Sequence, residues 1–275
     1  MVFSWDLGII SKVTFLVFLM LLLTSCDKKE SYKNISISVH AASGLYNPRS
    51  LFTDNTIEAV NYALGFKDLN GIEIDIQYSR DGTLWMFHDE LLDGRTDGEG
   101  VICSRSDEYL ETISYKGINS TKLSKLLEVD WSAVNGEKII YLDFKNLNTL
   151  SNCENYDISN FLNVLEIISS ENNHLMLVPV IDNKEVAEII FDAGYEVYSD
   201  VSSYSQEKAL TATFYSGFTI RQKELSASEI YDIQSSGKNV ILFDIFSLSS
   251  LKKAFKKAPY GIMAEDFKSA ILERN

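Results

Sequence analysis

Strand-like and helical patterns alternate along most of this chain, and this alternation limits the possible folds more than any other feature. The strand-like runs lie at 35–41, 71–79, 83–89, 138–145, 175–181, 196–201, 217–222, 239–245 and 260–266. Helical patterns lie at 55–66, 158–171, 183–194, 226–237 and 247–258, and the first of these is expected to be capped by Asp54 or Asn55. Such alternation predicts a parallel sheet, closed or doubly wound. We predict a single-domain α/β fold, a (β/α)8 TIM barrel, over residues 35–275.

The strand-like runs number one more than the eight that a barrel needs. The runs at 71–79 and 83–89 are joined by the turn Arg80-Asp81-Gly82, which is too short for a parallel crossover. One of that pair, or 196–201, therefore lies outside the barrel. Residues 90–137 are long and weakly patterned, and we predict that they form an excursion over the barrel mouth.

The N-terminus carries features of an exported protein. Residues 13–23 form an apolar run of signal-peptide length, too short for a comfortable membrane span. The following Leu23-Thr24-Ser25-Cys26 looks like a bacterial lipobox, so we predict a lipoprotein signal peptide over 1–26 with lipidation at Cys26. A plain signal peptide and an N-terminal membrane anchor are the alternatives. Residues 27–34 are expected to be a polar tether that holds the barrel at the membrane in the cell envelope, outside the cytoplasm.

The net charge of −14 argues against nucleic acid as a partner. It also means that a substrate carrying phosphate must meet a local positive centre. Cys103 and Cys153 remain after the predicted signal peptide, and an exported protein can pair them, although spacing alone leaves this open. The absence of a CxxC motif and of Cys/His zinc spacing argues against a structural zinc site.

Acidic side chains at alternate strand positions predict a metal site. Glu73 and Asp75 lie at i and i+2 of one strand-like run, and Asp143 and Lys145 do so in another. Residues at i and i+2 share one face of a strand, and two buried carboxylates are costly without a cation to neutralise them. Oxygen ligands favour one divalent cation, Ca2+ or Mg2+, over zinc.

Two of the three histidines are candidates for acid–base chemistry. His40 and His88 lie near the ends of predicted strands, where barrel active sites assemble, and imidazole titrates near neutral pH. His174 precedes its strand and is expected at the opposite, non-catalytic face. Asp244 and Asp266 also end strands, and each is either a rim residue or a helix cap.

In order along the chain, these motifs resemble the glycerophosphodiester phosphodiesterase family, whose barrel is also similar to phosphatidylinositol-specific phospholipase C. The family's His-Arg-Gly, Glu-Asn-Thr, Ile-Glu-hydrophobic-Asp, Asp-Gly, His-Asp and Arg-Thr motifs look like His40-Ala41-Ala42, Asp54-Asn55-Thr56, Ile72-Glu73-Ile74-Asp75, Asp81-Gly82, His88-Asp89 and Arg95-Thr96. The run Leu142-Asp143-Phe144-Lys145 is similar to its Glu-hydrophobic-Lys.

The resemblance implies metal-dependent hydrolysis of a glycerophosphodiester to glycerol 3-phosphate and an alcohol. It implies that His40 and His88 are the acid–base pair and that Lys145 contacts the phosphate. It also implies that Glu73, Asp75 and Asp143 bind the metal.

Two departures from the family pattern concern the predicted site. Ala41 replaces an arginine and so removes a fork-shaped phosphate donor, for which the point charge of Lys145 is no equivalent. Arg49, in the lengthened loop 43–53, is our candidate for the missing cation. Asp143 replaces a glutamate and reaches about one methylene less far, which favours a tighter or water-bridged metal site.

Two other functions remain open at this level. One is a phosphodiesterase that acts on phospholipid or wall-polymer diesters with the same metal and histidines. The other is a non-catalytic surface barrel that binds a phosphorylated ligand, which Ala41 and Asp143 would favour. Retention of both histidines and both Glu73 and Asp75 argues for catalysis.

Overall fold

The structure, a computed structural model, describes residues 32–275 except 118–120, 135, 146–152, 154–155 and 202–212. The predicted signal peptide, the lipidation site Cys26 and residues 27–31 of the predicted tether lie outside the described residues. At the end of that tether, Tyr32 stacks on Phe255 with 5.1 Å between ring centroids, so the chain is already packed against the barrel there. The described residues contain no helix that is long and apolar enough to cross a membrane.

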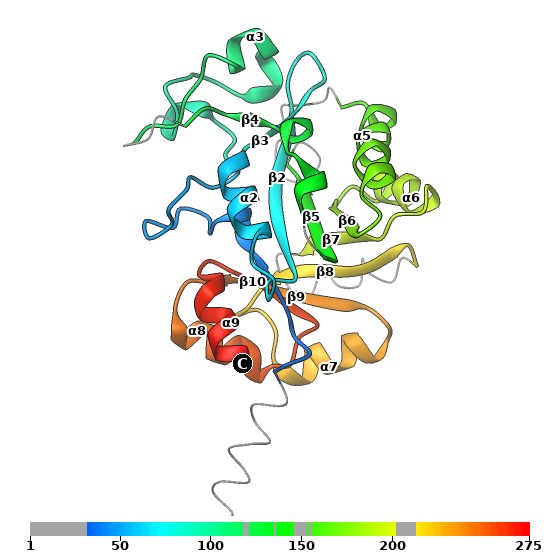
Figure 1. The fold of residues 1–275 in the computed structure, drawn as a ribbon. Coiled ribbons are helices and arrows are strands. Elements are labelled where there is room, and N and C mark those ends of the chain that lie inside the picture. The colour runs from blue at the N-terminus through cyan, green and yellow to red at the C-terminus, as the bar shows by residue number, and fades with distance from the viewer. Residues whose placement is uncertain (1–31, 118–120, 135, 146–152, 154–155, 202–212) are drawn as a thin grey trace, which may run out of the picture.

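Eight parallel strands close into a barrel, as the alternation of patterns predicted (Figure 1). Closure comes from pairing of the first strand with both the second and the last. The barrel strands are β1 (Ser36–Val39), β2 (Gly71–Tyr78), β5 (Lys138–Phe144), β6 (Leu175–Val180), β7 (Val197–Val201), β8 (Tyr215–Arg221), β9 (Asn239–Ile245) and β10 (Gly261–Ala264).

Antiparallel pairing explains the surplus strand. β3 (Leu84–Met86) runs antiparallel to β2, as its short turn requires, and the two-residue β4 (Ser124–Lys125) pairs with β3 on its far side. The run at 196–201 belongs to the barrel as β7, which pairs with both β6 and β8.

Helices cover the outside of the barrel (Figure 1). They are α2 (Ile57–Leu64), α5 (Ile158–Glu171), α6 (Lys184–Asp192), α7 (Ala227–Ser235), α8 (Leu248–Lys256) and α9 (Phe267–Arg274). The short α3 (Asp107–Leu110) lies instead in the segment between β3 and β5. The five predicted helices are all present. Each begins at a side chain that accepts a hydrogen bond from a backbone N–H two or three residues on, and so satisfies a donor that the first turn leaves free. The short α3 and the C-terminal α9 were not predicted.

The wall of the barrel separates two apolar layers. Ile72, Ile74 and Ile76 of β2 are fully buried in the outer layer against the helices. Tyr141 and Tyr198 pack edge to face inside the barrel, with ring centroids 5.8 Å apart. The side chains at alternate positions of β2, Glu73 and Asp75, therefore belong to the inward set, where an apolar filling would otherwise be expected.

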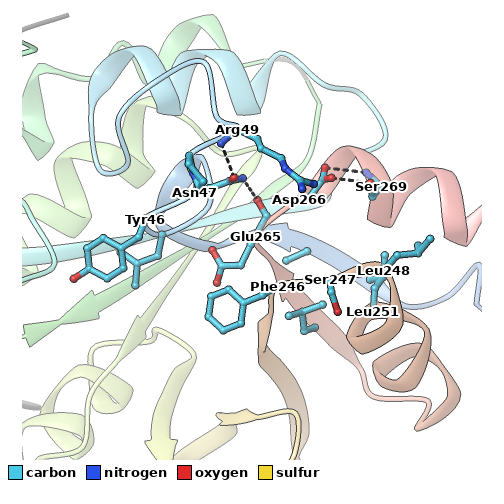
Figure 2. Close-up of a pocket in the computed structure, with 14 residues that line it drawn as sticks. Tyr46, Asn47, Arg49, Phe246, Ser247, Leu248, Leu251, Glu265, Asp266 and Ser269 are labelled. Carbon is cyan, nitrogen blue, oxygen red and sulfur yellow. Dashed lines mark hydrogen bonds between the residues drawn. The ribbon is translucent and has the colours of Figure 1, made fainter. Parts of the chain in front are cut away.

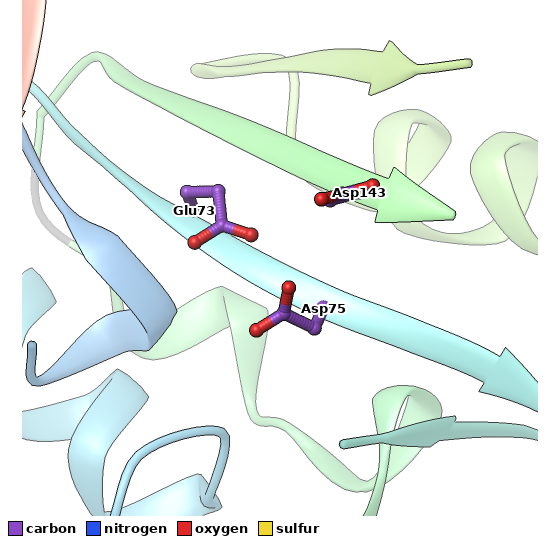
Figure 3. A group of neighbouring side chains, drawn as sticks. All are labelled: Glu73, Asp75 and Asp143. Atoms are coloured by element: carbon purple, nitrogen blue, oxygen red, sulfur yellow. The ribbon is translucent and has the colours of Figure 1, made fainter. Parts of the chain in front are cut away.

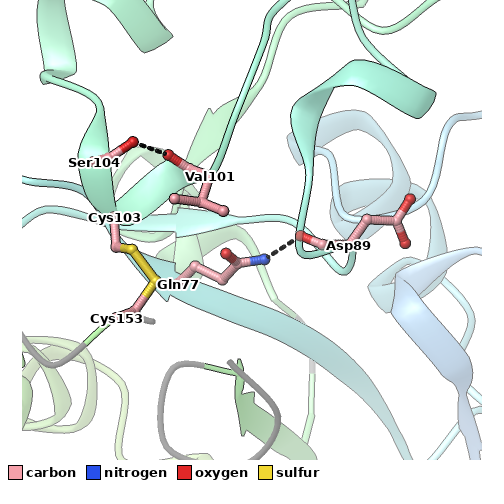
Figure 4. Close-up of a disulfide and its surroundings, with 6 residues drawn as sticks. All are labelled: Gln77, Asp89, Val101, Cys103, Ser104 and Cys153. Atoms are coloured by element: carbon pink, nitrogen blue, oxygen red, sulfur yellow. Dashed lines mark hydrogen bonds between the residues drawn. A yellow bond between two sulfur atoms is a disulfide. The ribbon is translucent and has the colours of Figure 1, made fainter. Parts of the chain in front are cut away.

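The segment between β3 and β5 adds a small core beside the barrel. Its centre is a separate apolar cluster of Trp85, Phe87, Leu92, Ile102, Leu110, Ile113, Tyr115 and Leu123. A disulfide joins Cys103 of this segment to Cys153, with the Cα atoms 5.8 Å apart (Figure 4). The pairing that the sequence left open is therefore present, and it ties the segment to the connection between β5 and α5.

Loss of this disulfide is expected to lower the free energy of unfolding. The crosslink spans 50 residues, and a loop of that length restricts the unfolded chain by about 4 kcal/mol in the chain-entropy model. Urea unfolding of Cys103→Ser and of the Cys103→Ser/Cys153→Ser pair, compared with the oxidised protein, measures the effect. Equal unfolding midpoints in all three proteins would contradict it.

Candidate active site

The carboxyl ends of the barrel strands surround a cavity of about 480 Å³. Five of the predicted site residues line it: His40, Glu73, His88, Asp143 and Lys145. His40 directly follows β1, Glu73 lies within β2 and His88 follows β3. Asp143 lies near the end of β5, and Lys145 directly follows that strand. Closure of the barrel thus brings together side chains that are up to 105 positions apart in the sequence.

Three carboxylates meet beside the cavity, of which Glu73 and Asp143 line it and Asp75 is fully buried (Figure 3). Glu73, Asp75 and Asp143 each place a carboxylate oxygen within 4.8 Å of the others. The strand register explains part of this, because Asp75 lies directly beside Asp143 across β2 and β5. Lys145 Nζ lies 2.8 Å from Asp75 and 2.5 Å from Asp143, so one ammonium is shared by two carboxylates.

The carboxylate group retains capacity for a cation. Glu73 is 3% exposed, and its Oε1 receives no hydrogen bond from the described residues. Burial and the charge of Asp75 raise the pKa of Glu73 well above its usual range. Burial also acts to raise the pKa of Asp75, but Lys145 and the two histidines outweigh it and lower this pKa. A buried, oxygen-only group with excess negative charge fits a hard divalent cation.

His40 is held by a second carboxylate that the sequence analysis missed. Its Nδ1 lies 2.6 Å from Glu265 Oε1, and its Nε2 lies 3.8 Å from Glu73 Oε2. Burial alone would lower the pKa of His40. The bond to Glu265 and the charges of Glu73 and Asp75 reverse this and raise the pKa to about 10. Glu265 directly follows β10, so it reaches His40 only because β10 pairs with β1.

The turn after His40 adopts a strained backbone. Ala41 and Ala42 both have positive φ angles, 48° and 61°, a conformation that costs about 1 kcal/mol or more for a residue with a Cβ. The Ala41 N–H donates to Glu73 Oε2 at 2.7 Å. The strained turn therefore supplies a donor to a candidate metal ligand, although no arginine side chain is present there.

His88 belongs to a hydrogen-bonded group at the edge of the cavity. Its Nδ1 lies 2.7 Å from Asp89 Oδ1 and 3.2 Å from the hydroxyl of Tyr46, which also donates to Asp89. The guanidinium of Arg95 lies 4.6 Å from the centre of the Tyr46 ring and is paired with Asp54. The loop 43–53 and the segment after β3 together orient this histidine.

The run Asp54-Asn55-Thr56 corrects the predicted cap of α2. We predicted Asp54 or Asn55 as the cap, but the Thr56 side chain accepts from the Ala59 N–H instead. Asn55, at φ 54°, donates through Nδ2 to Asp75 at 2.6 Å and accepts from the Asp75 N–H at 3.0 Å. Each of the three side chains has its own partner, and Asn55 holds a candidate metal ligand in place.

Arg49 does not line this cavity. It lines a neighbouring cavity of about 410 Å³ between loop 43–53 and the starts of α8 and α9 (Figure 2). The arginine that does line the catalytic cavity is Arg221, at the end of β8. Nothing in the sequence around Arg221 marked it, because it ends an ordinary strand-like run and lies outside the motifs, which stop at Lys145.

Asp244, Asp266 and His174 each occupy one of the positions expected from the sequence. Asp266 caps α9 by accepting from the Ser269 N–H, whereas Asp244 is on the cavity rim. His174 precedes β6 at the amino end of the barrel, and its backbone oxygen accepts from the Lys138 N–H. The described residues of 90–134 do not line the catalytic cavity, and Arg95 is their link to it.

Two half-buried acids near the cavity, Asp182 and Asp200, predict a pH-dependent stability. Burial and the charge of Asp200 raise the pKa of Asp182 to about 7, against an ordinary value of 3.8. Because this pKa is raised on folding, the associated stability is present below about pH 4 and is lost as the pH rises through 7. Asp182→Asn keeps an oxygen that can accept from Ser199 and from the Asp200 N–H.

We therefore expect Asp182→Asn to increase the free energy of unfolding at pH 8 by about 1–2 kcal/mol, a figure reduced for partial exposure. At pH 4 the variant and the parent should differ little. Urea unfolding at both pH values measures this, and an equal difference at the two would contradict it.

Residues 40–266 match the model of the Glycerophosphoryl diester phosphodiesterase family. No curated protein sequence matches the chain. Among solved structures, an Agrobacterium tumefaciens protein assigned as a glycerophosphoryl diester phosphodiesterase superposes with a TM-score of 0.73 at 16% identity, over 87% of this chain and 97% of its own. An Oleispira antarctica phosphodiesterase, solved in complex with the product sn-glycerol-3-phosphate, superposes with a TM-score of 0.69 at 19% identity. The match covers 89% of this chain and 98% of the Oleispira chain. A Thermotoga maritima glycerophosphodiester phosphodiesterase superposes with a TM-score of 0.62 at 18% identity, over 85% of this chain and 96% of its own.

At these identities the solved structures establish the barrel fold. The family model covers most of the chain, from His40 at the first strand end to Asp266 after the last strand. It therefore includes every side chain that closure of the barrel brings to the cavity. The family resemblance seen in the motifs is confirmed: the chain belongs to the glycerophosphoryl diester phosphodiesterase family, and it is a phosphoric diester hydrolase of that kind.

Proposed function

We propose that this enzyme hydrolyses glycerophosphodiesters to glycerol 3-phosphate and an alcohol in the cavity at the barrel mouth. The observation that carries the proposal is the convergence of two imidazoles, two carboxylates and one ammonium on that cavity, with the third carboxylate, Asp75, buried within 4.8 Å of the other two, in a member of this family. Those groups supply the acid–base and charge-stabilising functions that cleavage of a phosphodiester needs.

Glu73, Asp75 and Asp143 would hold one divalent cation, Ca2+ or Mg2+. When bound, such a cation supplies positive charge to the phosphate oxygens and compensates the excess negative charge of the site. Asn55 fixes one carboxylate oxygen of Asp75, and the Ala41 N–H fixes one of Glu73. Glu73 Oε1 receives no hydrogen bond from the described residues and would be available to the cation, whereas Asp75 Oδ1 lies 2.8 Å from Lys145 Nζ.

His40 and His88 would share the proton transfers. One imidazole takes a proton from the attacking hydroxyl or water, and the other protonates the leaving alkoxide. Each ring is anchored through Nδ1, to Glu265 in one case and to Asp89 in the other, which leaves Nε2 as the nitrogen for the reaction. Paired carboxylates also stabilise the imidazolium that each histidine forms when it accepts a proton.

Lys145 would offset the charge that develops on the phosphate. Its side chain is 11% exposed and its ammonium is bound by Asp75 and Asp143, so its position is fixed before substrate arrives. Burial would lower the pKa of Lys145, but those two carboxylates raise it well above its usual range, so it stays charged. A preorganised cation of this kind stabilises an anionic transition state without moving.

We also propose that the enzyme is lipid-anchored through Cys26 to a bacterial membrane in the cell envelope, with its barrel outside the cytoplasm. The apolar run 13–23 before Leu23-Thr24-Ser25-Cys26 supports this. The disulfide between Cys103 and Cys153 supports an oxidising compartment.

A product assay tests the proposed reaction. The full chain is incubated with glycerophosphocholine in Mg2+, in Ca2+ and in a chelator, and the products are followed by phosphorus NMR. Cation-dependent release of glycerol 3-phosphate is the expected result. Release of phosphocholine would show cleavage of the other ester bond. Turnover of phospholipid or wall-polymer diesters, with none of glycerophosphocholine, would contradict the proposed substrate class.

A further inference from the structure

Half of the catalytic cavity has no role in the proposed chemistry. The groups described above come from β1, β2, β3 and β5 and from the residue after β5. The opposite wall is built by β7, β8, β9 and the turn after β9. It presents Asp200, Thr219, Arg221, Phe243, Asp244 and Phe246. At about 480 Å³ the cavity is far larger than a phosphate group requires, so this wall faces a substituent of the phosphate.

The wall is centred on an ion pair with spare donors. Arg221 Nε lies 3.0 Å from Asp244 Oδ2, and the Arg221 side chain is 45% exposed. Among the described residues, none accepts a hydrogen bond from its two terminal amino groups. Asp244 holds a φ of 61° between two extended residues of β9, a strained conformation that is retained where the surroundings require it. The pair therefore offers a donor fork beside a carboxylate acceptor.

A second acceptor lies deeper on the same wall. Asp200 of β7 is opposite Thr219 of β8 in the strand register, and the Thr219 hydroxyl donates to Asp200 Oδ1 at 3.0 Å. Thr219 and Arg221 are at i and i+2 of β8, so both point into the cavity. Donors and acceptors thus alternate from the floor to the rim.

Phe243 sets the limits on what can bind here. Its ring lies 6.0 Å from the His40 ring, and the Arg221 guanidinium lies 5.5 Å from its centre. Because a cation already occupies this aromatic ring, it is a poor site for a quaternary ammonium. A purely apolar group would also be disfavoured, since it would cover two carboxylates and a guanidinium without hydrogen-bonding them.

A group with several hydroxyls satisfies all of these constraints. Each hydroxyl can donate to a carboxylate and accept from the guanidinium, while the C–H faces pack on Phe243 and Phe246. We propose that Asp200, Thr219, Arg221 and Asp244 form a subsite for the alcohol half of the substrate, and that this alcohol is a polyol such as a cyclitol or sugar alcohol. The inference rests on the proposed phosphodiesterase function and narrows its substrate class.

The test compares three diesters that differ in the alcohol. The full chain is assayed with glycerophosphoinositol, glycerophosphocholine and methyl nitrophenyl phosphate, as wild type and as Arg221→Met, which keeps an unbranched apolar stem. We expect the wild type to favour glycerophosphoinositol. We expect Arg221→Met to lower kcat/KM for this substrate by about 10- to 100-fold, mainly through KM, and to change the nitrophenyl diester by less than about twofold.

Arg80→Met is the matched control, because Arg80 is an exposed arginine paired with the neighbouring Asp81 outside the cavity. It should change none of the three rates. Equal losses for all three diesters in Arg221→Met, or a wild-type preference for glycerophosphocholine, would overturn the polyol subsite.

A binding measurement separates this inference from the proposed function. If the wild type hydrolyses none of the diesters, the proposed reaction is wrong, and calorimetric titration with glycerophosphoinositol decides the subsite. The subsite is supported if the wild type binds glycerophosphoinositol and Arg221→Met binds it at least tenfold more weakly. Absence of binding, or equal binding by both proteins, overturns it.

Discussion

His40→Asn and His88→Asn are each expected to lower kcat by about 100- to 10,000-fold while the barrel stays folded. Both imidazoles line the cavity, and each is anchored through Nδ1 by a carboxylate, Glu265 or Asp89. Asparagine keeps a hydrogen-bonding group at the position of Nδ1 but cannot take up or release a proton as an imidazole does. Steady-state kinetics with glycerophosphocholine, together with circular dichroism of each variant, measures the effect.

His174→Asn is the matched control for these variants. His174 precedes β6 at the amino end of the barrel and does not line the cavity. Its replacement should leave kcat within about twofold of the wild type. Turnover close to the wild type in both His40→Asn and His88→Asn would exclude the acid–base pair, and a loss as large in His174→Asn would indicate a folding defect instead.

Most of the barrel could be predicted because its strands and helices are encoded locally. The apolar residues of β2 alternate with polar ones, and helices such as α7 begin at a capping box that is readable in the sequence. The surplus strand was recognised from a turn too short for a parallel connection. Its assignment needed the pairing itself, because β3 and β7 have equally strand-like sequences.

The parts of the site that were missed depend on contacts between distant segments. Glu265 is 225 positions from His40, and its role comes from the pairing of β10 with β1. Asn55 looked like a helix cap because its neighbours are typical of one, yet its side chain holds Asp75. Arg49 was chosen for its closeness in sequence to Ala41, whereas Arg221 reaches the cavity from β8. The order of the motifs predicts which strands contribute residues to the active site. It cannot predict which side chains outside the motifs also reach the cavity.

Asp143→Asn is expected to raise the cation concentration needed for half-maximal activity by at least about tenfold and to lower maximal turnover by about 100-fold or more. Asp143 is one of three carboxylates within 4.8 Å of one another, and its loss leaves Glu73 and Asp75 as the remaining acidic ligands. Lys145 should stay in place, because it is also bound to Asp75 at 2.8 Å. Titration of activity with Mg2+ and with Ca2+ measures both effects.

Cation binding should also stabilise the fold, which gives a readout that does not depend on turnover. A ligand that binds only the folded chain at 100 times its Kd adds about 2.7 kcal/mol to the free energy of unfolding. We expect the wild type to lose this increment in chelator and Asp143→Asn to show little of it. Asp130→Asn, at an exposed position outside the cavity, should respond to the cation as the wild type does.

The two readouts together identify the role of the carboxylates. Burial and the charge of Asp75 raise the pKa of Glu73, so the three acids carry a cost in the metal-free protein that a cation would relieve. If the cation neither stabilises the wild type nor supports its turnover, the three carboxylates are not a metal site. In that case Lys145 and the histidines must balance them, and the proposed mechanism would lack the positive charge that the cation places near the phosphate.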